Sequence, residues 1–295
     1  MLALPRLGLG MAAPATLGPD TPDDAVVALV KRAHARGIEW FDTSPLYGSG
    51  RSEDLLGRAL SESPVRLSTK AGYVLTAPWG TNAPGEARRQ DFGTSAIDAS
   101  VAASLKRLGR TRIDLVLLHD PDKHLDAAVD QAFPALQRLK DQGVIGAIGV
   151  GVNRAETALA LLARIPLDAV LIAGRLTLLD WSAAFELLPA CRAMNVAIIA
   201  AGVLNSGILG GHAKFHYGPP PPETLARTAL LAEICADHGT SLKAAAFHYP
   251  ARHGGVSMTL IGARTAAELD ETLDLLETRL PEGVWRDLEN AGVGR

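Results

Sequence analysis

Four side chains that can take part in acid–base chemistry each follow a short apolar segment of the chain. They are Asp42, Tyr47, Lys70 and His119. A carboxylate can neutralise a lysine that has left water. The lysine ammonium in turn favours the phenolate form of a nearby tyrosine and lowers the pKa of that tyrosine towards neutrality. Such a tyrosine can exchange a proton with an oxygen that changes between alcohol and carbonyl, while a histidine donates a hydrogen bond to the same oxygen. The four residue types therefore suit an alcohol–carbonyl interconversion.

The apolar segments belong to an alternation of strand-like and helix-like patterns along the chain. We expect eight strands, at Leu7–Met11, Ile38–Phe41, Val65–Thr69, Asp114–Leu118, Val144–Val152, Asp168–Ile172, Val196–Ala200 and Met258–Ile261. Strands that alternate with helices imply right-handed crossovers and a parallel sheet. Eight such units in 295 residues predict an α/β fold, a (β/α)8 TIM barrel, formed as one domain over residues 1–295. An open, doubly wound sheet is the alternative that the same pattern allows.

The first expected helix, Asp23–Arg36, has recognisable ends. Thr21 is the expected N-cap, Pro22 suits the first helical position, and Gly37 suits the left-handed position beyond the last turn. The helix therefore leads from the first strand into the second.

In a barrel, the residues just beyond the carboxyl ends of the strands form the active face. Asp42 and Tyr47 would come from the second strand, Lys70 from the third and His119 from the fourth. Asp42 could then supply the opposite charge that a buried Lys70 needs. Each residue alone has an ordinary structural explanation, but together on consecutive strands they favour an active site.

Two other motifs allow different functions. Gly8–Ala13 formally matches the glycine-rich dinucleotide fingerprint, but Pro14 follows it at once and no acidic residue ends a second strand about 20 residues on. We interpret it as a glycine-rich strand end. His119–His124 contains several potential metal ligands, as in a metal-dependent hydrolase. Because a barrel metal site needs ligands from several strand ends and the other strands offer no further histidine, we expect no metal.

Composition limits the partners. The chain has 29 Lys and Arg against 32 Asp and Glu, a net charge of −3, so no basic surplus indicates a nucleic acid or an anionic membrane. Apolar runs such as Val196–Leu204 have about half the ~20 residues of a membrane helix. Cys191 and Cys235 cannot form a disulfide framework and indicate buried thiols in a reducing compartment. We expect a soluble, cytoplasmic protein that acts on a small molecule.

Several motifs, taken in their order, resemble the aldo-keto reductases. They are Phe41–Gly48 with Ser52 and Glu53, Leu67–Lys70, Asp114–His119, Ile148–Asn153 and Ile261–Thr265. The resemblance covers nearly the whole chain. It implies a (β/α)8 barrel that moves a hydride between a nicotinamide cofactor and a carbonyl or alcohol. It also implies that Asp42, Tyr47, Lys70 and His119 are the catalytic residues, with Tyr47 as the general acid/base. A barrel recruited as a binding module would have no need of all four.

The same resemblance implies a set of cofactor-binding residues. They are Asn153 at the nicotinamide carboxamide, Leu204, Asn205, Ser206 and Gly207 at the pyrophosphate, and Gly262, Arg264 and Glu268 at the adenosine end. Small residues in the pyrophosphate loop expose backbone N–H groups, which suit an anion. Two positions depart from the family pattern. A glutamine that helps to bind the carboxamide is replaced by Ala173, and the aromatic that stacks on the nicotinamide is replaced by Ala201. We therefore expect the nicotinamide to be held differently here.

The adenosine-end residues favour NAD over NADP. By motif, Gly262 stands where the family frequently has a lysine, and Glu268 where it frequently has an arginine. A carboxylate repels the 2′-phosphate of NADP and can accept a hydrogen bond from the ribose hydroxyl of NAD. Arg264 remains as a possible phosphate ligand and is the main argument for NADP.

Three segments resemble one branch of the family more closely. They are His119–Asp122, Ala147–Asn153 and Ala173–Leu179. That branch contains sugar 1-dehydrogenases acting on L-fucose, L-galactose or D-threo-aldoses, and pyridoxal 4-dehydrogenases. The expected reaction is the oxidation of a sugar hemiacetal to its lactone. Oxidation of pyridoxal, or a general reduction of aldehydes and ketones, is the alternative.

Overall fold

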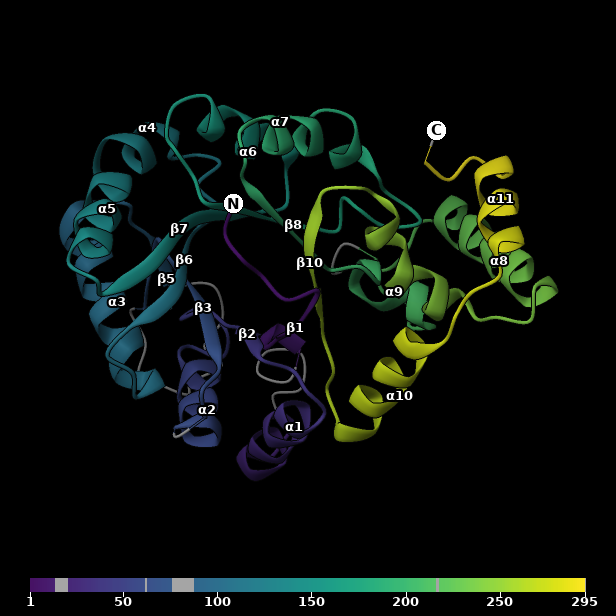
Figure 1. Ribbon diagram of the computed structural model, residues 1–295, viewed down its shortest axis with the longest axis horizontal. Helices are drawn as coiled ribbons and strands as arrows, with labels where there is room; N and C mark the ends of the chain where they lie inside the picture. Colours follow the sequence, from purple (N-terminus) through teal and green to yellow (C-terminus); the bar gives the residue numbers. More distant parts are fainter. Residues whose placement is uncertain (14–20, 62, 76–87, 216–217, 295) are drawn as a thin grey trace.

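Eight parallel strands close into a barrel in the computed structural model (Figure 1). They are β1 (Leu7–Gly10), β2 (Trp40–Asp42), β3 (Arg66–Ala71), β6 (Ile113–His119), β7 (Ile145–Val152), β8 (Ala169–Ala173), β9 (Ala197–Ala201) and β10 (Val256–Ile261). The structure describes residues 1–13, 21–61, 63–75, 88–215 and 218–294. The predicted barrel is confirmed, and it is not an open sheet, because β1 pairs with both β2 and β10.

Helices follow the strands and cover the barrel. They are α1 (Asp23–Ala35), α2 (Arg51–Leu60), α3 (Thr94–Leu108), α4 (Leu125–Ala127), η3 (Ala128–Ala132), α5 (Phe133–Asp141), α6 (Ala155–Leu162), η4 (Ser182–Ala184), α7 (Leu187–Ala193), η5 (Asn205–Gly210), α8 (Pro222–Asp237), α9 (Leu242–Arg252), α10 (Ala266–Glu277) and α11 (Glu282–Asn290). Helices α8 and α11 lie side by side at one flank of the barrel (Figure 1) and share a separate apolar cluster with α9. Within the described ranges, no helix has both the length and the apolarity needed to span a membrane.

The strands are apolar on both faces, because the barrel interior lies on one side and the helices lie on the other. In β6, Leu115 and Leu117 belong to the cluster inside the barrel. Val116 and Leu118, one residue out of phase, belong to the larger cluster between strands and helices. The period of two explains why these strands read as unbroken apolar runs in the sequence.

The start of α1 differs from the prediction, whereas its end agrees. Gly37 has a φ of +89°, the left-handed conformation expected beyond the last turn. Thr21 is not the N-cap, and Pro22 occupies that position without a side-chain bond to the helix. The carboxylates of Asp23 and Asp24 in the first turn favour this helix end through its dipole instead. Asp23 also accepts a 2.8 Å hydrogen bond from Arg51 Nε of α2.

A hairpin that the sequence did not predict lies between β3 and α3. It pairs β4 (Tyr73–Leu75) with β5 (Arg88–Gln90) in antiparallel register. Gln90 Nε2 donates to the Tyr73 hydroxyl at 3.0 Å and to the backbone carbonyl of Asp120 at 2.8 Å. The hairpin is therefore tied to the barrel where β6 ends.

The buried carboxylate of Glu53 joins α2 to two neighbouring elements. Glu53 is fully buried. It accepts hydrogen bonds from the Thr69 hydroxyl of β3 at 2.6 Å and from Arg107 Nε of α3 at 2.7 Å. These bonds hold α2 against the strand that carries Lys70.

We predict that Gly57→Ala destabilises the protein, although alanine normally stabilises a helix by ~1 kcal/mol relative to glycine. A Cβ atom at Gly57 would lie 2.6 Å from the carbonyl oxygen of Arg107 and 2.9 Å from that of Leu108. Because backbone atoms of α3 would have to move, we expect a loss of about 1–3 kcal/mol in the free energy of unfolding. Urea denaturation followed by circular dichroism measures it. An unchanged or higher denaturation midpoint would contradict this prediction and show that α2 and α3 can accommodate the extra methyl group.

Candidate active site

A buried ion pair lies inside the carboxyl end of the barrel. Lys70 Nζ is 2.6 Å from Asp42 Oδ2 and also donates to the Thr43 carbonyl at 2.9 Å. The side chains of Lys70 and Asp42 are only 2% and 4% exposed. The Ser68 hydroxyl donates to Asp42 Oδ1 at 2.8 Å, and Trp40 Nε1 donates to Ser68 Oγ at 3.1 Å. Because both carboxylate oxygens have partners, the burial of this pair is compensated.

Strand register accounts for the pairing. Asp42 lies opposite Ser68 in the parallel ladder of β2 and β3. Lys70 is two residues beyond Ser68, so its side chain points to the same inner face. The sequence therefore aligns an acid and a base on neighbouring strands.

Tyr47 lies against this pair from the loop that follows β2. Lys70 Nζ is 4.8 Å from the centroid of the Tyr47 ring. Burial alone would lower the pKa of Lys70, but the Asp42 carboxylate and the Tyr47 hydroxyl together raise it above its ordinary value. Lys70 therefore remains an ammonium, which favours the phenolate form of Tyr47.

His119, the last residue of β6, faces Tyr47. The two rings are nearly perpendicular, with centroids 6.2 Å apart. Burial, together with the charges of Lys70 and Arg88, lowers the pKa of His119 well below its ordinary value, so the imidazole is neutral. The Ser44 hydroxyl is 3.3 Å from His119 Nδ1. Ser44 Oγ accepts from Leu46 N–H at 3.1 Å, and in the tautomer of His119 with Nε2–H the Ser44 hydroxyl donates to Nδ1.

The structure thus brings together all four of the predicted acid–base residues, Asp42, Tyr47, Lys70 and His119. A tyrosine hydroxyl and an imidazole N–H that converge can hold one substrate oxygen between a proton carrier and a hydrogen-bond donor. The neighbouring ammonium makes the tyrosine a stronger acid. This arrangement suits proton transfer to or from an alcohol or carbonyl oxygen.

The potential metal ligands of His119–His124 do not converge. Asp122 Oδ1 accepts a 2.6 Å hydrogen bond from Thr157 of α6, and the His124 ring lies against Phe92 with centroids 5.5 Å apart. The residues that the structure describes contain no group of three or more His, Cys, Asp or Glu side chains placed to hold a metal ion.

Asn153 follows β7 and is held from two sides. Its Nδ2 donates to Asp120 Oδ1 at 3.2 Å, and its backbone carbonyl accepts from Arg175 Nε at 2.7 Å. Ala173 and Ala201 end β8 and β9 opposite each other in the ladder. The two positions that depart from the family pattern are therefore adjacent, near the strand end that Asn153 follows.

The predicted pyrophosphate loop has an unusual backbone. Asn205, Ser206 and Gly207 have φ angles of +46°, +62° and +109°, a run of left-handed conformations within η5. The loop follows Leu204 and packs on His212, because a Cβ at Gly207 would lie 3.0 Å from His212 Cβ. Asn205 Oδ1 is a buried acceptor with no donor among the described residues.

The predicted adenosine-end residues are joined to that loop. Arg264 NH2 is 2.7 Å from Glu268 Oε1 and 2.9 Å from His212 Nε2. Glu268 Oε2 also accepts from the backbone N–H of Arg264 at 2.8 Å. Glu268 thus neutralises Arg264, the cation that would otherwise favour the 2′-phosphate of NADP. Gly262 is exposed beside them.

These residues fit a nicotinamide dinucleotide by their chemistry. Arg264 and His212 provide groups for an anionic or ribose end. Ala173, Ala201 and Gly262 leave room for a planar ring or a close backbone approach, and Asn153 provides an amide for a carboxamide.

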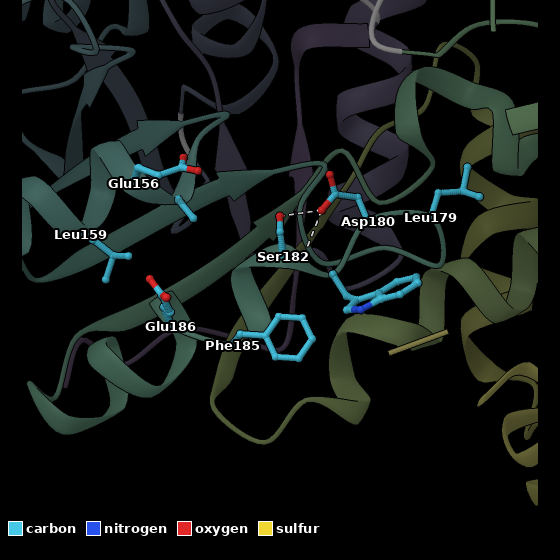
Figure 2. Close-up of a pocket in the computed structure, with 9 residues that line it drawn as sticks. Glu156, Leu159, Leu179, Asp180, Ser182, Phe185 and Glu186 are labelled. Atoms are coloured by element: carbon cyan, nitrogen blue, oxygen red, sulfur yellow. Dashed lines mark hydrogen bonds between the residues drawn. The ribbon is translucent and has the colours of Figure 1, made fainter. Parts of the chain in front are cut away.

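A second concave region lies away from these residues. It is a cleft of about 460 Å³ between α6 and the segment 179–186. Figure 2 shows Glu156 and Leu159 of α6, with Phe185 and Glu186, among the side chains that line it. None of the four acid–base residues lines it. Asp180, in its wall, pairs with Arg175 at 2.6 Å and so supports the residue that holds Asn153.

Several residues of the site were missed by sequence reasoning. Ser44 and Ser68 lie within the quoted motifs, and their hydroxyls could have been recognised as partners for His119 and Asp42. Arg175 and His212 lie in loops beyond β8 and β9, and no sequence periodicity fixes their positions along those loops. Their roles depend on the directions in which long side chains leave loops.

The closed barrel and the convergent acid–base side chains at its mouth define a barrel oxidoreductase. The model of the aldo/keto reductase family matches residues 6–292, and the chain belongs to that family. Aldo-keto reductases use nicotinamide cofactors. The resemblance noted in the sequence is thereby confirmed.

Individual relatives are similar over nearly their whole length. The chain is 37% identical to a D-threo-aldose 1-dehydrogenase of a Pseudomonas species, over 98% of this chain and 94% of the relative. It is 34% identical to a pyridoxal 4-dehydrogenase of Microbacterium luteolum, over 99% of this chain and 95% of the relative. The solved structure of a glycerol dehydrogenase of Gluconobacter oxydans superposes with a TM-score of 0.79 at 26% identity, over 97% of this chain and 91% of that one.

We predict that Lys70→Met raises the pKa that governs turnover. The Lys70 charge favours the phenolate, so its removal moves the alkaline pH requirement of oxidation upward. Asp42→Asn should also change this pKa, because it leaves the buried Lys70 ammonium without its counter-charge. The pH–rate profile of turnover, followed by absorbance of the reduced nicotinamide, checks both variants.

Stability measurements control for unfolding of these variants. Each single substitution leaves one buried charge unpaired and should cost about 3–5 kcal/mol, whereas the double variant Asp42→Asn with Lys70→Met should cost less than the sum of the two. Profiles of both folded single variants that superimpose on wild type would refute the coupling.

Proposed function

We propose that the chain oxidises the hemiacetal carbon of an aldose, such as L-fucose or L-galactose, to the lactone with NAD. The observation that carries this proposal is the Lys70 ammonium, 2.6 Å from Asp42 and over the ring of Tyr47, beside a neutral His119. The family supports the reaction type. The 37% identity to a D-threo-aldose 1-dehydrogenase over nearly both chains supports the substrate class.

Each residue has a defined task in this reaction. Tyr47, as phenolate, takes the proton of the substrate hydroxyl, while His119 Nε2–H donates to the same oxygen. The O–H bond breaks, a C=O bond forms, and the hydrogen on the same carbon departs as hydride. Nicotinamide, when bound, supplies the acceptor for that hydride. Lys70 stays charged throughout, and Asp42 keeps it in place.

Asn153, with Leu204–Gly207, is proposed to hold the nicotinamide and pyrophosphate portions, and Gly262, Arg264 and Glu268 the adenosine end. Oxidation of pyridoxal is the second candidate, because a relative with 34% identity is named a pyridoxal 4-dehydrogenase. A general aldehyde or ketone reductase is the third.

A substrate panel tests the proposed function. Purified protein is given NAD or NADP with L-fucose, L-galactose, D-glucose or pyridoxal, and with simple aldehydes in the reductive direction. Formation or loss of the reduced nicotinamide is followed by absorbance. We expect the highest kcat/KM with an aldose and NAD. A higher kcat/KM for pyridoxal would support the second candidate, and reduction of aldehydes without sugar oxidation the third.

We predict that Tyr47→Phe abolishes turnover but keeps the fold and the binding of cofactor. Only the phenolic hydroxyl is lost, while the ring still packs over Lys70. General acid–base catalysis typically contributes about 10²–10⁴ in rate, so kcat should fall by that factor. Thermal unfolding and NADH fluorescence titration serve as controls. A variant with more than half of the wild-type kcat would exclude Tyr47 as the general base.

We predict that Glu268→Gln shifts the cofactor preference towards NADP. The amide keeps its volume and a hydrogen bond to Arg264 but removes the negative charge, so the Arg264 cation becomes available to a 2′-phosphate. One partly solvated charge contact is worth about 1–2 kcal/mol, or roughly tenfold in the ratio of kcat/KM for the two cofactors. Glu268→Arg should shift the ratio further. Wild-type preference for NADP, or an unchanged ratio in both variants, would contradict this interpretation.

A further inference from the structure

Asp120 lies beside the catalytic histidine in a strained backbone conformation. It follows His119 at the end of β6 with a φ of +48°. Left-handed backbone costs roughly 1–2 kcal/mol for most residues, and aspartate and asparagine adopt it more readily. Such an outlier next to a reacting group often has a functional reason.

Nearly all polar groups of Asp120 are engaged with protein. Its N–H donates to the Gly151 carbonyl at 2.9 Å, and its own carbonyl accepts from Gln90 Nε2 at 2.8 Å. Oδ1 accepts from Asn153 Nδ2 at 3.2 Å. Oδ2 lies 3.8 Å from His119 Nε2, which is too long for a hydrogen bond. Among the described residues, Oδ2 is therefore the one polar atom of Asp120 without a hydrogen-bond partner.

Within the described ranges, no lysine or arginine pairs with this carboxylate. Burial and the nearby Asp122 raise the pKa of Asp120 to about 6, and the charge of Lys70 and the bond from Asn153 offset this only in part. The side chain is 26% exposed, so a ligand can reach it. A carboxylate with one weak donor gains most from an added O–H donor.

We propose that Asp120 is a substrate-binding residue whose Oδ2 accepts a hydrogen bond from the hydroxyl on the carbon next to the reacting carbon, the C2 hydroxyl of an aldose. This rests on the proposed function. His119 Nε2 holds the reacting oxygen, and Oδ2 lies 3.8 Å away. Two hydrogen bonds of ordinary length from these atoms reach two oxygens on adjacent carbons. The pair therefore selects substrates with vicinal oxygens.

The other candidate substrates match this pair less well. A simple aldehyde has no second hydroxyl to donate. In pyridoxal the nearest hydroxyl is an acidic phenol, one carbon further from the reacting carbon, and its anion would be repelled by the carboxylate. Asp120 thus favours a polyhydroxylated substrate over both.

The test is a cycle of two sugars and three proteins. The ratio of kcat/KM for L-galactose to that for 2-deoxy-L-galactose is measured for wild type, Asp120→Asn and Asp120→Gly, because asparagine and glycine both tolerate a positive φ. The intrinsic effect of the missing hydroxyl is the same for every protein and cancels in the comparison. A hydrogen bond to a charged group contributes strongly to binding, so its loss changes this ratio. We expect the ratio in the glycine variant to be roughly 10- to 100-fold lower than in wild type, and the ratio in the asparagine variant to lie between the two.

Asp122→Asn is the matched control. It lies in the same turn, and its carboxylate accepts a hydrogen bond from Thr157 of α6. The Asp122 charge raises the pKa of Asp120, so all assays are run well above that pKa, where Asp120 is ionised in both proteins and the sugar ratio of Asp122→Asn should equal that of wild type. NADH titrations of all variants detect any loss of cofactor affinity that arises because Asn153 is displaced. If the Asp120 variants weaken NADH binding and slow both sugars equally, Asp120 only positions Asn153 and the proposal is overturned. If L-galactose is oxidised but the ratio does not change, the proposal fails while the proposed function stands. If neither sugar is oxidised and pyridoxal is, the proposed function is wrong, and the proposed role of Asp120 is overturned with it.

Discussion

The buried pair of Lys70 and Asp42 is the interaction on which the site depends. Neither charge could remain inside the barrel alone, because an unpaired buried ion costs several kcal/mol. The fold meets this requirement through the register of β2 and β3, and through Ser68 and Lys70, which donate to the carboxylate, while Trp40 donates to the Ser68 hydroxyl. The same charge that must be neutralised for folding is the one proposed to favour the phenolate form of Tyr47. Stability and chemistry therefore share one contact.

The parts of the site predicted from sequence are those that strand periodicity determines. Asp42, Lys70 and His119 lie at or near strand ends, so the barrel alone brings them to one face. Asn153 is placed in the same way by β7. Loop positions are different, since the role of Arg175 depends on a long side chain that reaches back to Asn153 over a distance no pattern encodes. The β4–β5 hairpin was missed for a related reason, because three-residue strands carry too little periodicity.

Local electrostatics explain two further differences between expectation and structure. The N-terminus of α1 uses the charges of Asp23 and Asp24 where the sequence indicated a Thr21 cap. Glu268 was predicted to face the cofactor directly, whereas it binds Arg264 four residues earlier. Arg264 precedes Thr265, the extended N-cap residue of α10, so the pairing forms across the start of the helix and helical spacing does not predict it. In the proposed function, cofactor choice therefore depends on the pair of Arg264 and Glu268, and not on either residue alone.

The end of β6 explains how the site can function without two side chains typical of the family. Ala173 and Ala201 contribute no amide and no aromatic ring, so the proposed function leaves the orientation of the nicotinamide to Asn153. Asp120 and Arg175 hold its side chain and its backbone, and Asp180 holds Arg175 in turn. Because Asp120 also lies beside His119, one residue connects the group proposed to orient the cofactor with the group proposed to bind the reacting oxygen.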